Sequence, residues 1–529
     1  MTSTTPTSIV ARYDVIVIGA GHNGLVCATT LARAGRSVLV VEAAADVGGM
    51  AITRAFAPGY RVSACAHLLH QMPLALVRDL GLAEHGLEFA ATGLPTTSLG
   101  ADGATLQLAT GGTPSAAFTP NDAAAWPAYH ARLGRFASLL HGMLAAPAPR
   151  LGTEGWSDKL ALAKVGLKLR LLGRRDMREF LRIVGMNAYD LLEDEFEAPL
   201  LKGALAFDAV LGTNFGPRAP GTVLSLLYRL AAESAAGSSP LAQPRGGLGA
   251  LTAALARSAK AAGVTIRTNA PVAQITVAGD RATGVVLANG TEIAAGRVVS
   301  SVNAKTTFLN LLGTEHLDTG FVRRVDHIRS RGIVAKLHLA LDRAPAFTGV
   351  ARAALGGRLL VSPSLDYLER AFNPTKYSQF SAAPALEITV PTINDAALAP
   401  AGHHVLSAIV QYAPYALSGG WTEPSRRAFT DAILATLEAQ APGIGASVVG
   451  CELLTPLDLE QEFHSAGGHW HHGDLALDQF YMVRPVPGAT QYATPMAGLY
   501  LCGASCHPGG GVMGLAGRNA AVRMLEKGA

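Results

Sequence analysis

Side chains that can donate, accept or transfer protons are concentrated in one stretch near the C-terminus, FHSAGGHWHHGDLALDQFYMVR at residues 463–484. Imidazole, carboxylate and amide groups act as general acids or bases when they are held beside a reacting bond. The stretch therefore predicts part of a catalytic site. Its candidates for moving a proton or holding a substrate are His469, His471, His472, Asp474, Gln479 and Arg484. Several of these are expected to bond to the returning chain, so that only one or two face a cavity.

A glycine-rich turn near the N-terminus has the spacing of a dinucleotide-binding site. Gly19, Gly21 and Gly24 lie in VIGAGHNGLV, after an apolar run and before a segment of helical periodicity. The first glycine allows a tight bend, the second lets a pyrophosphate approach the backbone, and the third lets the helix pack on the strand. A second apolar run ends in Glu42, whose carboxylate can accept hydrogen bonds from a ribose and disfavours a 2′-phosphate. The pattern predicts FAD or NAD rather than NADP.

The whole chain excludes several classes of protein. Its 529 residues are long for one core and favour two interleaved domains. The 43 basic and 39 acidic residues give a net charge of +4 without a basic cluster that alternates with aromatics, so no nucleic-acid partner is predicted. No apolar run has the length of about 18 residues that a spanning helix needs. Residues 1–9 are Ser/Thr-rich and are expected to be a disordered lead-in rather than a signal peptide, which favours a cytoplasmic protein.

The residues after the first βαβ unit suit a backbone packed against a cofactor. Gly48, Gly49 and Met50 follow the second strand. Flavin disulfide reductases carry two cysteines four residues apart directly after such a glycine pair, and their absence here argues against thiol chemistry. His67 and His70 are spaced as on one face of a helix, where they are expected to be polar contacts near a pocket rather than metal ligands. No metal site is predicted.

The middle of the chain is predicted to form a substrate domain. Residues 92–120 suggest short strands and turns, residues 123–211 read as helical, and the alternating strands after residue 332 suit a large antiparallel sheet that carries a substrate cavity. Basic side chains interleave with Leu and Val in the helical part, and this pattern fits either a solvated helix face or contact with a membrane surface. These basic residues are Lys159, Lys164, Lys168, Arg170, Arg174, Arg175, Arg178 and Arg182.

Two later segments bear on the cofactor. PRGGLGAL at residues 244–251 is not preceded by an apolar strand, so it is not counted as a second dinucleotide fingerprint. At the C-terminus a strand at residues 498–503, a glycine-rich turn and a helix after residue 512 are predicted to place a second helix N-terminus against the cofactor, where its dipole would stabilise a reduced, anionic flavin. Together the two segments favour FAD over NAD.

With these motifs in view, the chain resembles the FAD-dependent phytoene desaturase and amine oxidase superfamily, and within it the phytoene-dehydrogenase-like group. The matching segments are VIGAGHNGLV (residues 17–26), Glu42, Gly48-Gly49, PRGGLGAL (244–251), HHGDLALDQFYMVRP (471–485) and GLYLCGASCHPGGGVMGLAGRNAA (498–521). The resemblance implies an α/β protein whose Rossmann-like FAD-binding domain comprises residues 1–90, 241–310 and 466–529. An interleaved α+β substrate domain, with a large mixed or antiparallel sheet and a helical cap, would comprise residues 91–240 and 311–465.

The resemblance also implies roles for particular residues. In amine oxidases a strand lysine holds a water at flavin N5, and Lys336 in GIVAKLHLAL resembles that lysine, although an outward-facing strand lysine fits the pattern equally well. The residues implied to contact FAD are Gly19, Gly21, His22, Asn23, Gly24, Glu42, Gly48, Gly49, Met50, Val272, Gly503, Gly511, Val512 and Met513.

The leading hypothesis is an FAD-dependent dehydrogenase, or desaturase, of a lipophilic small molecule. A hydride would pass to flavin N5, a proton would leave to a side chain or water, and O2 or a quinone would accept the electrons. Three alternatives stay open: an amine oxidase that releases hydrogen peroxide, a carotenoid-type isomerase that uses reduced flavin, and a non-catalytic flavin-bound interaction protein. The sequence is compatible with a homodimer and with a peripheral membrane contact.

Overall fold

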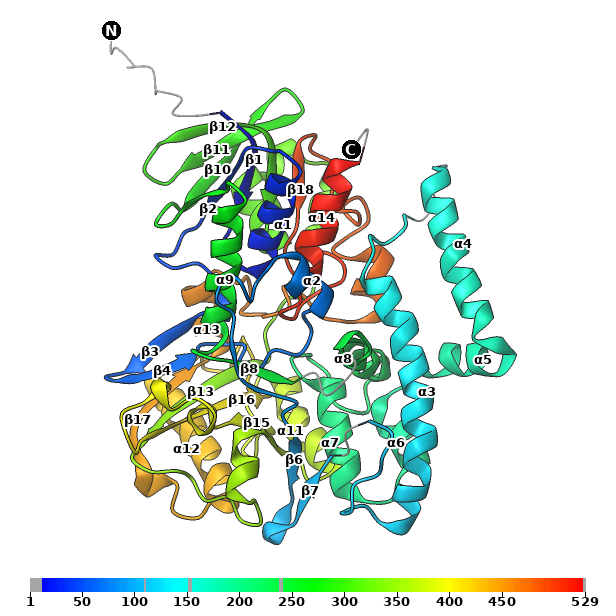
Figure 1. Ribbon diagram of the computed structural model, residues 1–529, viewed down its shortest axis with the longest axis vertical. Coiled ribbons are helices and arrows are strands. Elements are labelled where there is room, and N and C mark those ends of the chain that lie inside the picture. Colours follow the sequence, from blue (N-terminus) through cyan, green and yellow to red (C-terminus); the bar gives the residue numbers. More distant parts are fainter. Residues whose placement is uncertain (1–11, 109–110, 151–154, 237–240, 527–529) are drawn as a thin grey trace.

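Two sheets and a group of helices organise the chain in the computed structural model (Figure 1). The structure describes residues 12–108, 111–150, 155–236 and 241–526, so the predicted lead-in at residues 1–9 lies outside the described residues. One sheet lies at the top of Figure 1 beside both termini, the second lies at the bottom, and the helices α3 to α8 flank them on the right. The predicted α/β fold class is confirmed.

We call the sheet at the top of Figure 1 the nucleotide sheet, because its strand β1 leads into the predicted glycine turn. It contains seven strands among the described residues, in the order β10-β11-β12-β1-β2-β9, with β18 beside β12. Strands β1, β2, β9, β12 and β18 run parallel, and β10 and β11 add an antiparallel hairpin. Its strands are β1 (Arg12–Ile18), β2 (Val38–Val41), β9 (Thr265–Arg267), β10 (Val272–Ala278), β11 (Arg281–Leu287), β12 (Glu292–Ser300) and β18 (Leu499–Leu501).

Helices cover this sheet closely, which is why its central strands are apolar on both faces. Three helices lie beside it, α1 (His22–Arg33), α9 (Leu248–Ala261) and α14 (Leu515–Leu525), and α1 packs on both of the others. Val15 and its neighbours through Ile18 are buried, as is all of β2. The two ends of the chain therefore share one core.

The apolar and β-branched residues at 264–277 do not form one continuous strand. The segment forms two strands, β9 and β10, which lie at opposite edges of the nucleotide sheet. Asn269, at a left-handed φ of 51°, and Pro271 interrupt the extended run between them. Proline lacks the N–H that a continuing ladder needs, so the chain can leave one edge there and rejoin the other.

The second sheet also has seven strands among the described residues, in the order β17-β13-β16-β15-β14-β6-β7. All neighbours are antiparallel except β14 and β6. On β13, Leu337 and Leu339 pack towards a core that includes residues of α12 (Glu423–Gln440), so Lys336 and His338 lie on the other face. The strands are β6 (Thr96–Leu99), β7 (Thr105–Gln107), β13 (Val334–Leu341), β14 (Arg358–Val361), β15 (Leu386–Thr389), β16 (His404–Gln411) and β17 (Val448–Leu454).

A helical cap packs against the second sheet. Its helices are α3 (Pro120–Leu144), α4 (Trp156–Leu171), α5 (Gly173–Ile183), α6 (Ala188–Glu195), α7 (Pro199–Val210) and α8 (Thr222–Ala236). α3 packs on α8, and Leu133, Phe136 and Phe207 lie in the shared core. α4 and α5 lie outside α3 at the edge of the molecule (Figure 1). Within the described ranges, no helix combines the length and the apolar character needed to cross a bilayer.

Shorter elements connect these layers. They are α2 (Leu74–Asp79), α10 (Thr319–Asp326), α11 (Leu365–Phe372), α13 (Pro456–Phe463), β3 (Thr53–Ala57), β4 (Tyr60–Ser63), β5 (Phe89–Thr92) and β8 (Ala242–Pro244). The helix expected around His67 and His70 is wrong, because this segment between β4 and α2 is irregular. The backbone of Leu69 exchanges two hydrogen bonds with Ala242, at 2.8 and 2.9 Å, and these replace helical bonding.

We propose that the chain is organised as the two interleaved domains expected from the sequence. Residues 1–90, 241–310 and 466–529 then hold the whole nucleotide sheet, and residues 91–240 and 311–465 hold the whole second sheet and the cap. This division keeps each of the two seven-stranded sheets within one unit.

Candidate active site

A cavity of about 500 Å³ is lined by residues from the nucleotide sheet, the second sheet and the cap. This size falls within the range of small-molecule and cofactor sites, roughly 300–1,000 Å³. One part of its wall comes from the turn between β1 and α1 and from the end of β2, and another part comes from α7, α8, β15 and β16. The cavity therefore joins a nucleotide-binding surface to a surface of the substrate domain.

The glycine turn of the nucleotide sheet is built for close contact. A Cβ on Gly24 would lie 2.1 Å from the carbonyl oxygen of Gly19, so a larger residue cannot occupy that position without moving the turn. Gly19 has a φ of 92°, which favours glycine. A Cβ on Gly21 would meet nothing within 4 Å. Gly21 caps α1 without a side chain, and the first turn of α1 has no acidic residue, so its N–H groups and dipole are available to an anion.

Glu42 lies at the end of β2 and lines the cavity. Its Oε2 accepts a hydrogen bond from the N–H of Ala20 at 2.6 Å, and its Oε1 accepts one from Ala44 at 3.0 Å. These bonds hold the carboxylate at the turn and leave each oxygen with a further lone pair for a ribose hydroxyl. The backbone of Glu42 also bonds to Ala270, which brings the start of β10 and Val272 to the same wall.

Buried polar atoms along the cavity wall fit a bound dinucleotide. Among the described residues, several wall atoms are buried without a hydrogen-bond partner: His22 Nε2, Asn23 Oδ1, Ser225 Oγ, Trp470 Nε1, His471 Nδ1 and His472 Nδ1. A buried polar atom without a partner costs free energy, so such atoms gathered along one wall indicate a polar ligand. The cradle of glycines and the unpaired wall atoms together suit FAD.

The cofactor residues expected from the sequence fall into two groups. All of them line the cavity except Gly503 and Met513. Gly503 packs on the backbone of Ser301, where a Cβ would lie 2.2 Å from the carbonyl oxygen. Met513 lies in the core of the cap, 3.9 Å from the hydroxyl of Tyr228. Gly511 and Val512 do reach the wall, so the C-terminal turn contributes through residues just beside these two.

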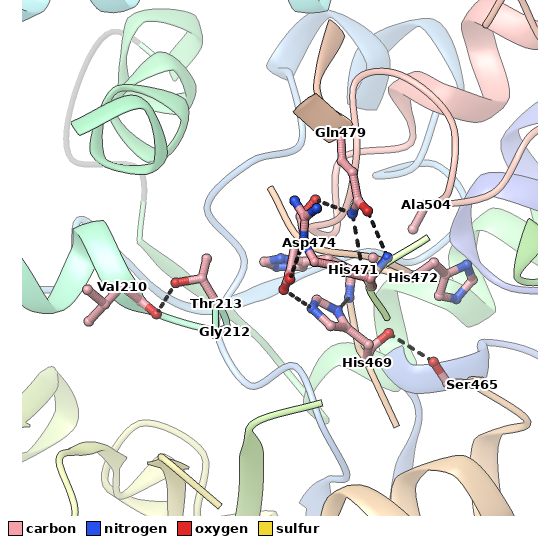
Figure 2. A network of polar contacts seen from close by, with 12 residues as sticks. Val210, Gly212, Thr213, Ser465, His469, His471, His472, Asp474, Gln479 and Ala504 are labelled. Atoms are coloured by element: carbon pink, nitrogen blue, oxygen red, sulfur yellow. Dashed lines mark hydrogen bonds and ion pairs between the residues drawn. The ribbon is translucent and has the colours of Figure 1, made fainter. Parts of the chain in front are cut away.

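In the polar stretch at residues 463–484, too, some of the predicted residues line the cavity and others do not. His471 and His472 line the cavity, whereas Asp474, Gln479 and Arg484 are not among the described lining residues. Asp474 accepts a hydrogen bond from His469 Nε2 at 3.0 Å, and Figure 2 shows these two side chains and Gln479 in one polar network.

Gln479 and Arg484 bind the folded-back chain rather than a ligand. Gln479 accepts from the N–H of Arg329 at 2.7 Å and donates back to its carbonyl at 3.2 Å. The buried guanidinium of Arg484 donates to the carbonyl oxygens of His471, Gly473, Asp474, Gln479 and Ala504. These contacts hold His471 and His472 in place.

His471 and His472 are neutral at pH 7. Burial, followed by the positive charge of Arg484, lowers the pKa of His472 to about 3. Burial also lowers the pKa of His471 well below its usual range, and the neighbouring His469 adds to the effect. A neutral imidazole can donate at one ring nitrogen and accept at the other, so both residues can hold a ligand without carrying charge.

A group of charged side chains, missed in the sequence, lies at the substrate-domain wall, with Arg358 and Glu387 buried and Asp208 and Arg229 partly buried. Arg358 donates from Nε to Glu387 at 2.6 Å and from Nη2 to Asp208 at 2.5 Å. Arg229 Nε lies 2.8 Å from Asp208, and its Nη2 lies 3.7 Å from Glu387. Asp208, Arg229 and Glu387 line the cavity. Burial alone would raise the pKa of Glu387, but the positive charges of Arg358 and Arg229 and the hydrogen bond with His67 together outweigh burial and hold the pKa well below its usual range.

Lys336 is connected to this group through a histidine. Its buried Nζ lies 2.7 Å from Nδ1 of His67, whose Nε2 lies 2.8 Å from Oε1 of Glu387. Because a carboxylate only accepts, the ring proton is assigned to Nε2, and Nδ1 accepts from Lys336. Burial lowers the pKa of Lys336 to about 7 and that of His67 to about 4. Lys336 is thus neither outward-facing nor among the described lining residues, whereas His67 lines the cavity.

Comparison with known proteins places this geometry in a family. The sequence pattern described as "Flavin containing amine oxidoreductase" matches residues 24–525. A mouse (Mus musculus) protein named pyridine nucleotide-disulfide oxidoreductase domain-containing protein 2 is 36% identical, with 96% of this chain and 93% of that protein covered. A limonene dehydrogenase polypeptide of Castellaniella defragrans is 26% identical, with 98% of this chain and 95% of that protein covered.

A solved structure shows the same fold. Putrescine oxidase with bound putrescine superposes with a TM-score of 0.60 at 16% identity, over 97% of this chain and 98% of that one. The family match spans nearly the whole described chain, from the glycine turn to the end of α14. The chain therefore belongs to the flavin-containing amine oxidoreductase family and is an FAD-dependent oxidoreductase.

Proposed function

We propose that this oxidoreductase dehydrogenates a neutral, lipophilic small molecule to form a double bond, and that O2 or a quinone accepts the electrons. FAD, when bound, supplies the hydride acceptor. The observation that carries the proposal is the charge balance of the substrate-domain wall. Asp208 and Glu387 each lie against arginines, so neither carboxylate presents an uncompensated negative charge to a substrate ammonium group.

The rest of the wall supports a substrate without charge. Leu68, Leu211, Ile409 and Leu475 line the cavity together with the rings of Tyr228 and Trp470. Apolar walls with a few placed polar groups are typical of sites for small organic ligands. The relative named as a limonene dehydrogenase is consistent with this substrate class.

In this proposal the residues of the chain have separate tasks. Gly21, Glu42 and the N-terminus of α1 hold the dinucleotide, and His471 and His472 act as neutral hydrogen-bonding groups at the wall. Neither histidine is a base near pH 7, because their pKa values are strongly lowered. Lys336 Nζ, whose pKa is about 7, can exchange a proton near neutral pH and can fix the tautomer of His67. We assign it that positioning role.

Anaerobic reduction of the purified holoprotein tests the proposal. The flavin absorbance should bleach with members of a panel of polyenes, fatty acyl compounds and small alicyclic alkenes, and should return on mixing with O2 or a quinone. Bleaching by amines alone, or purification without flavin even after reconstitution with FAD, would refute it.

Substitution of Arg229 tests whether the charges of the cavity wall select the substrate. Arg229→Gln removes one positive charge beside both carboxylates and is expected to weaken bleaching by neutral substrates relative to amines. Arg218→Gln is the matched control, because Arg218 is an exposed cap residue that pairs with Asp366. If the two variants gave the same substrate profile, the wall charges would not select the substrate.

A flavin amine oxidase that releases hydrogen peroxide is the second candidate. It is favoured by the buried Lys336, which can be neutral near physiological pH and lies one hydrogen bond from the cavity-lining His67. Peroxide release on a panel of mono- and diamines would support this alternative. Silence across that panel, with bleaching by alkenes, would leave the dehydrogenase.

A further inference from the structure

The outer face of α4 carries a line of exposed, large apolar side chains. Trp156, Leu160, Leu167 and Leu171 are 77%, 58%, 58% and 74% exposed. Their spacing of four, seven and four positions places them on one side of an α-helix. At 1.5 Å per residue this line, which we call the α4 stripe, is about 22 Å long. Exposed apolar patches of this kind mark surfaces that bind a partner or a membrane.

The opposite face of α4 already meets the protein. Asp158 is buried and accepts hydrogen bonds from Arg150 and from Gln491. Leu169 packs against the core of the cap. α4 is therefore apolar on two opposite sides, only one of which is covered by the chain. A solvated surface helix carries polar residues on its outer side, so this pattern is not that of an ordinary exposed helix.

Basic side chains flank the α4 stripe on both sides. With 3.6 residues per turn, Lys159 and Arg170 project on one side of it, and Lys164 and Lys168 on the other. Arg174, Arg175 and Arg178 continue the positive surface along the exposed part of α5. The Nζ of Lys159 lies 5.4 Å from the ring centroid of Trp156.

The acidic residues of these two helices do not balance this charge. Asp158 is paired with Arg150, Asp176 with Arg135, and Glu179 with Arg182. In the described part of the chain, no ion pair within 4 Å involves Lys159, Lys164, Lys168, Arg170, Arg174, Arg175 or Arg178. The surface is thus an apolar line within a positively charged border.

We infer that α4 and α5 dock the protein onto an anionic lipid bilayer, with the α4 stripe at the boundary between headgroups and acyl chains. A helix that lies in a membrane interface has this composition: Trp and Leu on the buried side, with Lys and Arg beside it. Lipid phosphates supply the negative charge that the protein lacks here. A second copy of the chain fits less well, because a two-fold contact would bring the basic borders of two α4 helices together.

Vesicle co-sedimentation of the full-length holoprotein tests this docking. The protein should bind vesicles of phosphatidylcholine with about 30% phosphatidylglycerol, bind pure phosphatidylcholine at least tenfold less, and lose binding as salt rises from about 0.05 to 0.5 M. Lys159→Gln, Lys164→Gln and Arg170→Gln together should weaken partitioning by about 100-fold, at about fivefold for each charge. Leu160→Ser, Leu167→Ser and Leu171→Ser together should abolish it.

Matched controls separate docking from folding and from other apolar sites. Val449→Ser with Tyr377→Ser alters two exposed apolar side chains elsewhere, at 57% and 75% exposure, and should leave vesicle binding unchanged. Flavin content and melting temperature should be equal in all variants. Trp156 should shift its fluorescence to the blue on binding, and Trp156→Phe should remove that shift, since Trp126 and Trp421 are buried and Trp470 lines the cavity.

Three results would overturn the inference. They are absence of binding to anionic vesicles, equal binding to neutral ones, and a concentration-dependent dimer in light scattering that the leucine variants dissociate. The last outcome would assign the stripe to a second copy. None of these measurements uses turnover, so their outcome is independent of whether the proposed dehydrogenation is correct.

Discussion

The charged residues at the cavity wall compensate one another's charges. Arg358 is buried between Asp208 and Glu387 and contacts both carboxylates within 2.6 Å. Burying charges is costly, and removing one partner of such a set leaves the other without compensation, at roughly 3–5 kcal/mol. The set is therefore expected to be rigid, which suits a wall that must present arginines and carboxylates without a net charge.

Lys336→Met tests the charge state of the buried lysine. The pKa of Lys336 falls from 10.5 to about 7 on folding, with burial as the main cause. Below pH 7 the lysine is protonated in both states, and the folded state bears the full free-energy cost of burying its charge. This cost decreases as the pH rises from 7 to 10.5, where only the unfolded state still holds the proton, and it is absent above 10.5. The wild type should therefore gain unfolding free energy relative to Lys336→Met across that interval, at about 1.4 kcal/mol per pKa unit.

Chemical denaturation of both proteins at several pH values measures this difference. Lys260→Met, at an exposed position of α9, is the matched control and should leave the pH profile of the wild type unchanged. If Lys336→Met and the wild type gave parallel profiles between pH 7 and 10.5, the buried lysine would be protonated throughout that range.

Residues with local signals could be predicted, and residues assembled by the tertiary fold could not. Gly19, Gly24 and Glu42 could be read from the sequence because their roles depend on one βαβ unit. Asp208 and Glu387 come from a cap helix and a strand that are distant in sequence. Each stands as a single acid among apolar neighbours, LAFDAV and ALEITV, and that isolation was the only signal available.

At the scale of elements, the packing of α1 on α14 sets the position of the cofactor turn. A Cβ on Gly517 would lie 2.0 Å from the carbonyl oxygen of Asn23, at the start of α1. The two helices therefore meet backbone to backbone, and Asn23 lines the cavity. Close packing of this kind cannot be read from periodicity, because the pattern shows which face is apolar but not which helix covers it.

Gly517→Ala is expected to push the helices apart. Overpacking of a close contact costs typically about 1–3 kcal/mol, so the variant should unfold more easily and should hold FAD more weakly. Gly134→Ala in α3 is the control, because a Cβ there meets nothing within 4 Å and alanine favours a helix by about 1 kcal/mol. If the two variants had equal stability in denaturant and equal FAD affinity, the contact between α1 and α14 would accommodate a methyl group without a free-energy cost.

The C-terminal element shows where local prediction reached its limit. The strand, glycine turn and helix expected there are present as β18, the turn and α14, but α14 begins at Leu515 rather than after residue 512. Residues 463–484 form mostly turns whose hydrogen bonds converge on Arg484. Such a segment has no period of its own, so its conformation depends on contacts that only the complete fold supplies.

At the scale of the whole molecule, the cavity connects segments that the chain order separates. Its wall takes Gly21 from the first βαβ unit, Val272 and Glu387 from the middle, and Gly511 from the C-terminal turn. FAD contacting this wall would bind the folded arrangement of all these segments and not the unfolded chain. A ligand of that kind stabilises the folded state in proportion to its concentration.

We therefore expect FAD to raise the stability of the apoprotein as a single cooperative unit. At a free concentration 100 times the Kd, the gain in unfolding free energy should be about 2.7 kcal/mol, with the melting temperature rising as FAD is added. Probes in both sheets should report the same midpoint, for example Trp421 beside the second sheet and hydrogen exchange of β1. NADPH at equal concentration is the control, since Glu42 disfavours a ribose 2′-phosphate. The expectation would be wrong if the protein melted in two separate transitions and FAD raised the melting temperature of the nucleotide sheet alone. That result would show that the substrate domain folds independently and that the cavity wall forms without the cofactor.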